Sequence, residues 1–157
     1  KIKKFKKDKY LERIMKNNLM LVYTEHKRDS SKIISSQKRN KNVILKQYDQ
    51  IKYIAHTLPK ILKKKSISNI ANVFKKHWSI KKTLSKEISN HRIDSLYDFL
   101  INKCNCLGGK LIGAGGGGFF LVVVKNKKKA ISLFKKYNIN YLNFNIENHG
   151  SRILKDL

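Results

Sequence analysis

The sequence predicts an α+β fold in which helices flank a small antiparallel β-sheet, within a single domain of residues 1–157. Two observations lead to this prediction. Apolar residues recur at helical spacing through the middle of the chain, whereas short apolar runs of strand length lie near its start and towards its end. The resulting order is strand, helices, strand–loop–strand, helix, strand, which is typical of an α+β protein.

The first part of the chain is predicted to place one strand between two helices. Asp29 or Ser30 is the expected N-cap of the second helix, because short polar side chains accept hydrogen bonds from the first turn. In order, the expected elements are a helix at 8–17, a strand at 19–23, a polar turn at 24–28 and a helix at 30–39 broken at 40–42.

The middle of the chain is predicted to be helical. Apolar positions from 43 to 62 follow helical spacing, and Pro59 is expected to end or kink that helix. Ser66 or Ser68 is expected to start the next helix, and Asn90 marks the boundary of another.

The character of the sequence changes at Leu107. Seven of the eight glycines lie between Gly108 and Gly118, before an apolar, β-branched strand at 119–124. A helix at 127–137 and a last strand at 141–146 complete the expected elements.

The formal net charge is +26, from 36 basic and 10 acidic residues. A nucleic-acid binder would explain this charge, since basic surfaces release counterions from phosphates. However, only five of the basic residues are Arg, the residue favoured for base readout, and the Lys are spread along the whole chain. Biased composition is therefore the preferred interpretation, with no specific nucleic-acid partner expected.

Neither a metal site nor a membrane segment is predicted. Cys104 and Cys106 are too few ligands for structural zinc, and the five His residues show no metal-ligand spacing. The longest apolar run, at 119–124, is far shorter than the roughly 20 residues of a spanning helix. The basic start of the chain is not followed by the apolar stretch of a signal peptide, so we expect a cytoplasmic protein with reduced thiols.

The glycine-rich stretch Gly113–Gly118 formally satisfies the pattern G-x-G-x-x-G. It opens a strand rather than a helix, so the dinucleotide-binding interpretation fails, and a P-loop would need Lys-Ser or Lys-Thr after the glycines. So many glycines are entropically costly in a simple hairpin turn. Close approach to a ligand, with backbone N–H groups facing anionic oxygens, would account for them.

The segment Lys110–Phe119, KLIGAGGGGF, resembles the third motif of the GHMP kinases, Lys-x-x-Gly-Ala-Gly-Gly-Gly-Gly leading into a strand. Further segments are similar to the D-glycero-D-manno-heptose 7-phosphate kinases of that superfamily. These are 77–85 (HWSIKKTLS) with Ile88, Ser89, Ile93, Asp94 and Tyr97, the element Leu21–Thr24 with Arg28 and Ser30, and the tail 144–147 with Gly150 and Ser151.

The resemblance implies the C-terminal half of a two-domain enzyme with a ferredoxin-like core. ATP, with Mg²⁺, would phosphorylate the anomeric hydroxyl of heptose 7-phosphate for activated-heptose and surface-polysaccharide synthesis. The main ATP loop and the catalytic acid belong to the family's N-terminal domain, which no stretch of this chain matches. That domain is the implied partner, and this half alone is expected to be inactive, with no catalytic residue of its own.

The resemblance also implies site residues. Those expected to contact the nucleotide are Gly113, Ala114, Gly115, Gly116, Gly117 and Gly118, and those expected to contact the sugar phosphate are Thr24, Arg28 and Lys110. Glu25 departs from the pattern, because the heptose branch has Gly there. If that position requires a positive φ, Glu25 strains the turn and brings a carboxylate near the sugar-phosphate site.

Two other functions stay open. One is a non-catalytic basic binding module that retains the fold, and the other is a different GHMP sugar kinase, such as a fucokinase-like enzyme. An upstream half with a Gly-Ser-Ser-type ATP loop would separate the enzymes from the binding module.

Overall fold

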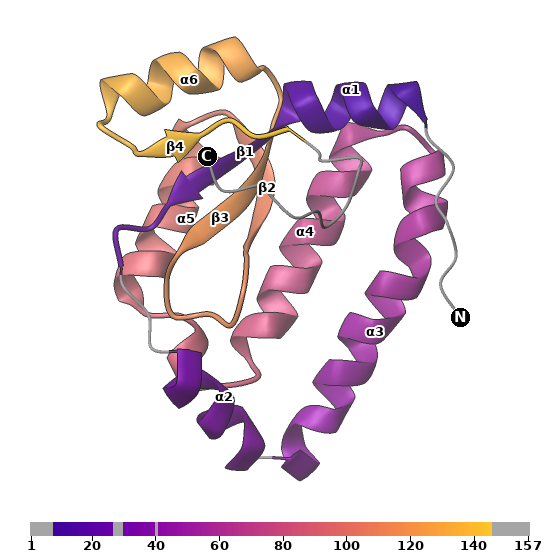
Figure 1. Ribbon diagram of the computed structural model, residues 1–157, viewed down its shortest axis with the longest axis vertical. Helices are drawn as coiled ribbons and strands as arrows, with labels where there is room; N and C mark the ends of the chain where they lie inside the picture. Colours follow the sequence, from indigo (N-terminus) through magenta and orange to yellow (C-terminus); the bar gives the residue numbers. More distant parts are fainter. Residues whose placement is uncertain (1–7, 27–29, 40, 146–157) are drawn as a thin grey trace, which may run out of the picture.

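The computed structural model describes residues 8–26, 30–39 and 41–145. They form a four-stranded antiparallel sheet in the order β2-β3-β1-β4, accompanied by helices (Figure 1). The strands are β1 (Leu19–Tyr23), β2 (Cys106–Leu111), β3 (Phe119–Val124) and β4 (Tyr141–Leu142). The helices are α1 (Lys9–Asn18), α2 (Ser30–Arg39), α3 (Lys41–Lys63), α4 (Ile67–Lys82), the 3-10 turn η1 (Lys86–Ile88), α5 (His91–Lys103) and α6 (Lys127–Lys136). The predicted α+β class is confirmed.

Figure 1 shows how the elements surround the sheet. Helices α3 and α4 run side by side along one flank, α5 lies behind the strands, and α1 and α6 lie at one end. The connection between β2 and β3 projects toward the opposite end, where α2 and η1 are located. The glycine-rich stretch is therefore the tip of the central hairpin.

Side chains from the two sheet faces enter two apolar clusters, because neighbouring residues of a strand point to opposite faces. Met20 and Val22 on one face pack with Trp78, Leu100 and Phe134 of α4, α5 and α6. Trp78 is fully buried, its ring meeting Phe120 edge-on at 5.6 Å between centroids. Trp78 is therefore part of the core.

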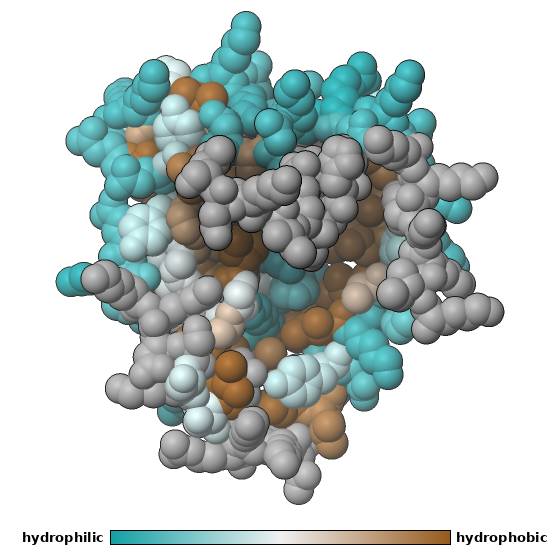
Figure 2. Space-filling model, viewed as in Figure 1, coloured by the Kyte–Doolittle hydropathy of each residue, from teal (hydrophilic) through white to brown (hydrophobic). Residues whose placement is uncertain are grey.

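The opposite face packs Leu19 and Val123 against Ile14 of α1 and Ile70 of α4. Further along this face the paired residues Leu21 and Leu121 are only half-buried. Figure 2 shows hydrophilic residues gathered over α6 and α1, and apolar residues around a hollow near the middle of the molecule. Helical cover of this face is thus incomplete among the described residues.

Capping residues fix several helix starts. The Ser66 side chain accepts from Asn69 N–H to begin α4, and the Asn90 side chain accepts from Ile93 N–H to begin α5. Both boundaries were predicted, because Ser and Asn oxygens satisfy the free N–H groups of a first turn. Asp29 and Arg28 lie outside the described residues.

Two elements end elsewhere than expected. Of the two outcomes expected at Pro59, an end or a kink, the helix end is wrong, because α3 continues past Pro59 to Lys63. A proline removes one intrahelical hydrogen bond, and the rest of the helix retains its own. The last strand, expected over 141–146, pairs with β1 only at Tyr141 and Leu142. Alternation alone does not form a strand without a neighbour to pair with. Glu147, Gly150 and Ser151 lie outside the described residues.

Candidate functional site

The glycine loop, Gly113–Gly118, joins β2 to β3 above a closing hydrogen bond from Ile112 N–H to Phe119 O of 2.9 Å. Its glycines have φ values that other residues rarely adopt: 77° at Gly113, 123° at Gly115, 69° at Gly116, 146° at Gly117 and 97° at Gly118. Side chains there would clash with the backbone itself. The backbone path therefore accounts for much of the glycine content.

Packing accounts for more of it. A Cβ atom at Gly115 would lie 2.9 Å from Ile88 Cα of η1, and one at Gly116 would lie 2.6 Å from Ile33 Cδ1 of α2. A Cβ at Gly117 would overlap the carbonyl oxygen of His26. The loop is thus pressed against three other segments of its own chain.

Two loop amides are already engaged. Gly116 N–H donates to Ile88 O at 2.8 Å, and Gly118 N–H donates to His26 O at 3.3 Å. Sequence reasoning assigned the glycines to an anionic ligand alone. The structure shows that η1 and the segment after β1 use part of the loop backbone, so the amides of Gly116 and Gly118 are not available to an anion.

Hydrogen bonds around η1 fix the segment that receives the loop. Ser85 caps η1, and Ser89 Oγ donates to Asp94 Oδ1 at 2.9 Å. Lys82 Nζ of α4 meets the same Asp94 oxygen at 3.0 Å. Ile88 is therefore held between α4 and α5, with its carbonyl presented to Gly116.

Thr24 anchors the other end of the loop. Its backbone N–H and its Oγ1 hydroxyl both donate to Gly118 O, at 2.9 and 3.0 Å. This residue was predicted to bind the sugar phosphate. In the structure the Thr24 hydroxyl donates its proton to a carbonyl of the loop, so it can only accept a hydrogen bond from a ligand.

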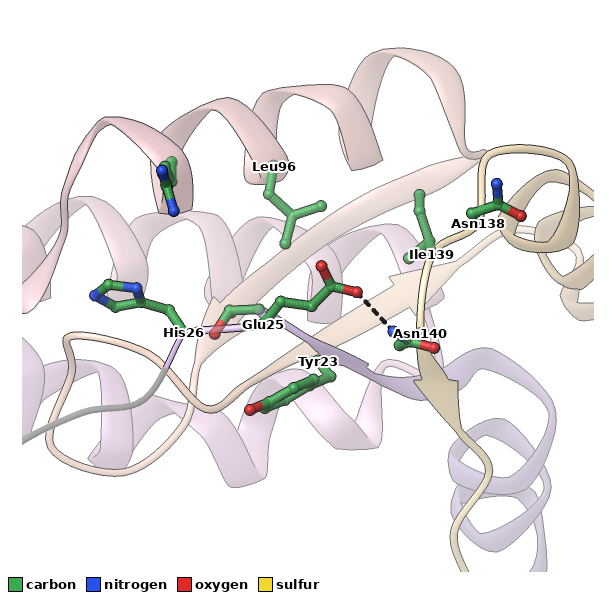
Figure 3. Close-up of a pocket in the computed structure, with 9 residues that line it drawn as sticks. Tyr23, Glu25, His26, Leu96, Asn138, Ile139 and Asn140 are labelled. Carbon is green, nitrogen blue, oxygen red and sulfur yellow. Dashed lines mark hydrogen bonds between the residues drawn. The ribbon is translucent and has the colours of Figure 1, made fainter.

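A pocket of about 300 Å³, here the Thr24 pocket, opens beside this anchor (Figure 3). Glu25 Oε1 accepts from Asn140 Nδ2 at 2.6 Å inside it. Carboxylate, amide and guanidinium groups together suit hydroxyl-bearing ligands. It is lined by Tyr23, Thr24, Glu25, His26, Arg92, Leu96, Asn138, Ile139 and Asn140.

Glu25 adopts φ 56°, in the left-handed region that favours glycine. The position therefore has the backbone conformation that would explain a glycine in the heptose branch. The carboxylate of Glu25 lies in the Thr24 pocket, as Figure 3 shows.

Lys110 lies on β2 and faces α4, with Nζ 6.0 Å from the centre of the Phe74 ring. The side chain is half-buried, and burial lowers the pKa of its ammonium group. It lines a second hollow of about 340 Å³, here the Lys110 pocket. The lining residues are Tyr48, Ile51, His77, Lys81, Leu84, Lys110, Leu111, Ile112, Gly113 and Ala114.

Lys81 is a residue that sequence reasoning missed. It is the one buried charged side chain among the described residues. Its Nζ donates to Leu111 O at 3.1 Å and to Gly113 O at 2.5 Å, where β2 enters the glycine loop. The available signal was its spacing, since Lys81 follows Trp78 by three residues on an otherwise apolar helix face.

His77 lines the Lys110 pocket, and its Nδ1 is buried with no hydrogen-bond partner among the described atoms. Burial, together with the smaller effects of the charges of Lys110 and Lys81, lowers its pKa to about 4. The imidazole is therefore neutral at physiological pH.

The predicted substrate residues are not brought into one pocket. Thr24 and Lys110 line two pockets that share no lining residue, with the glycine loop between them. Arg28, the third, lies outside the described residues. A ligand contacting both sides would have to cross the loop.

The described part of the chain holds no group of three His, Cys, Asp or Glu residues placed to bind a metal ion. Cys104 and Cys106 are buried free thiols, and burial raises the pKa of both. No helix of the described residues has the length and apolar character needed to cross a membrane.

Comparison with protein families gives a match to "GHMP kinases C terminal" over residues 60–143, more than half of the chain. The chain therefore belongs to this family of kinase C-terminal domains. The matched range includes α4, α5, both strands of the central hairpin and the glycine loop. A search of curated protein sequences gave no match.

Solved structures share the fold. The L. major mevalonate kinase in complex with R-mevalonate superposes with a TM-score of 0.66 at 17% identity, covering 78% of this chain and 38% of that one. The Methanococcus jannaschii mevalonate kinase gives 0.62 at 22%, covering 92% and 44%. A Lin0012 protein from Listeria innocua gives 0.66 at 20%, covering 80% and 38%. The chain thus spans less than half the length of these proteins.

Proposed function

We propose that residues 1–157 are the C-terminal domain of an ATP-dependent sugar-phosphate kinase that phosphorylates the anomeric hydroxyl of a heptose 7-phosphate. The single observation that supports this best is the glycine loop of a GHMP-family domain, which packs against other segments of the same chain and has a pocket near each of its ends. The similarity of residues 77–85 and 21–24 to the heptose 7-phosphate kinases supports heptose 7-phosphate as the substrate.

In this proposal the two domains divide the work. An N-terminal GHMP kinase domain supplies the main ATP loop and the catalytic acid. This chain supplies the backbone of Gly113–Gly118 and the side chains of Thr24, Arg28 and Lys110. Phosphoryl transfer depends on positioning and on neutralising phosphate charge. The Lys110 ammonium group provides positive charge for the phosphate, and the anchored glycine loop provides a rigid surface that positions the substrate.

Mg²⁺ prefers carboxylate and phosphate oxygens. The described residues offer no carboxylate cluster for it. We therefore assign Mg²⁺, with most contacts to ATP, to the N-terminal domain. The phosphorylated heptose would then be activated with a nucleotide in the cytoplasm, and the activated heptose would be used for surface polysaccharide.

The position of the Glu25 carboxylate favours a second candidate function. Its carboxylate in the Thr24 pocket would repel a phosphate group but would accept hydrogen bonds from sugar hydroxyls. A fucokinase-like enzyme acting on an unphosphorylated sugar fits that chemistry. A non-catalytic binding module with the same fold is the remaining alternative.

The test is ATP turnover with heptose 7-phosphate, measured for this chain alone and for the chain joined to, or mixed with, a GHMP N-terminal domain encoded upstream. We expect turnover only when both domains are present. Turnover in neither form would reject the kinase assignment and leave the binding module.

A further inference from the structure

The Lys110 pocket has an unusual charge balance. Its described lining includes two lysines and a histidine and no acidic residue. Both lysines act on the same imidazole, since the charges of Lys110 and Lys81 disfavour protonation of His77. The positive potentials of the two ammonium groups therefore overlap inside one hollow.

Each cationic group is fixed in place. Lys81 is held by the carbonyl oxygens of Leu111 and Gly113. Lys110 is a strand residue whose ammonium group lies near the Phe74 ring and is partly removed from water. Ammonium groups that are positioned and partly desolvated bind anions more strongly than mobile surface lysines do.

His77 adds a polar group that the protein does not satisfy. Its buried Nδ1 has no partner among the described atoms, and a neutral imidazole can donate one N–H to an acceptor. Because His77 lines the hollow and is neutral, its ring can face a bound anion without adding a charge that must be balanced.

We propose that the Lys110 pocket is an anion-binding site that takes a phosphate group, contacted by Lys110 and His77 and stabilised by the charge of Lys81. A phosphate monoester carries nearly two negative charges and three strong acceptor oxygens, which matches two ammonium groups and one imidazole. The volume of about 340 Å³ is near the lower limit for ligand sites, so it suits one phosphate group and a small attached body.

This site deepens the proposed function and rests on it only for the identity of the ligand. The phosphate could come from a sugar phosphate or from a nucleotide. The charge pattern that defines the site is present in this chain without any second domain. Binding can therefore be measured without catalysis, and a failed turnover assay would leave this proposal standing.

The experiment follows the ¹⁵N-labelled 157-residue chain by NMR during titration with four probes. Inorganic phosphate and glucose 6-phosphate represent monoesters, and pyrophosphate and ADP represent nucleotide phosphates. The pKa of His77 is measured with and without each probe. A bound anion is expected to raise that pKa from about 4 toward the ordinary 6.5, because it favours the imidazolium.

The net charge of +26 makes a matched control essential. Lys110→Gln should weaken binding by about tenfold or more, since a charge-assisted hydrogen bond is lost. Lys75→Gln removes the same charge from an exposed position of α4 that lines neither pocket, and should leave binding nearly unchanged. His77→Gln provides a second variant, also expected to weaken binding, should Lys110→Gln fold poorly.

Stronger binding of the monoesters would assign the site to a sugar phosphate, and stronger binding of pyrophosphate and ADP would assign it to a nucleotide; either supports an anion site. Three results would overturn it. These are no binding, equal losses in Lys110→Gln and Lys75→Gln, or an unchanged His77 pKa at saturation.

Discussion

Lys81 connects a helix to the glycine loop through one side chain. Burying an ammonium group is unfavourable unless its donors are satisfied, and the carbonyls of Leu111 and Gly113 provide that satisfaction. Both carbonyls lie where β2 gives way to the loop. Lys81 thus acts as a positioning residue for the first turn of the loop.

Replacing Lys81 tests this role. Lys81→Met keeps much of the side-chain volume and removes both hydrogen bonds, so we expect a loss of about 1–2 kcal/mol in the free energy of unfolding. Urea denaturation measures the loss, and amide exchange at Ala114 and Gly115 should become faster. Lys75→Met, on the exposed face of the same helix, is the control. Equal stability of the two variants would show that the buried ammonium positions nothing.

Glu25 carries a conformational strain that a pair of substitutions can isolate. Its φ of 56° is unfavourable for a residue with Cβ. Glu25→Ala and Glu25→Gly both remove the hydrogen bond to Asn140, but only the glycine relieves the backbone. We therefore expect the glycine variant to be more stable than the alanine variant by about 1 kcal/mol in thermal or urea unfolding. A more stable alanine variant would contradict the strain.

At the scale of elements, η1 and the segment after β1 form a seat for the central hairpin. Gly116 and Gly118 donate to carbonyls of these segments, and Gly117 packs against His26. The seat is itself fixed by the Ser89–Asp94–Lys82 contacts. The glycine loop is consequently packed against the rest of the domain and hydrogen-bonded to it.

Alanine substitutions within the loop should separate packing from backbone strain. Gly117→Ala combines φ 146° with overlap of the His26 carbonyl, whereas Gly113→Ala has φ 77° and open space for a Cβ. We expect Gly113→Ala to cost about 1 kcal/mol, and Gly117→Ala to cost about 2 kcal/mol more. Denaturant unfolding of both variants measures the difference. Similar losses would mean that the seat does not constrain the loop.

Elements with a local signal could be predicted from the sequence. Ser66 and Asn90 are short polar residues directly before apolar-periodic segments, and both cap helices as expected. The strand at Phe119–Val124 was evident from its β-branched run. In each case the information lies within a few residues of the feature.

Features set by long-range packing could not be predicted in this way. The contact of Lys81 with Gly113 joins residues 32 positions apart, and the loop's seat depends on where η1 lies. The short β4 depends on a partner strand, β1, more than a hundred residues earlier. The separation of Thr24 from Lys110 into two pockets likewise follows from the path of the loop between them.

For the whole molecule, His77 makes stability depend on pH. Its pKa is about 4 in the folded chain and 6.5 without the fold, so the native state favours the neutral ring. The unfolded chain takes up a proton first as pH falls. Stability from this group is therefore fully present above pH 6.5 and declines between pH 6.5 and about 4.

A single proton gives at most about 1.4 kcal/mol per pH unit, and less for this half-buried ring, which water partly screens. His77→Gln should flatten the decline of urea midpoints between pH 6.5 and 4.5. His91→Gln, at an exposed position of α5, should leave the decline unchanged. Identical pH profiles for the wild-type chain and His77→Gln would contradict the effect of burial and the two lysines.

The most direct test of the central claim is the choice of acceptor once this chain is combined with a GHMP kinase N-terminal domain. ATP-dependent phosphorylation would be measured with heptose 7-phosphate, fucose and mevalonate after joining this chain to such a domain. We predict the highest kcat/KM for heptose 7-phosphate and no measurable turnover by this chain alone. A preference for fucose or for mevalonate, or no phosphorylation of any of the three acceptors, would contradict the assignment as a sugar-phosphate kinase domain.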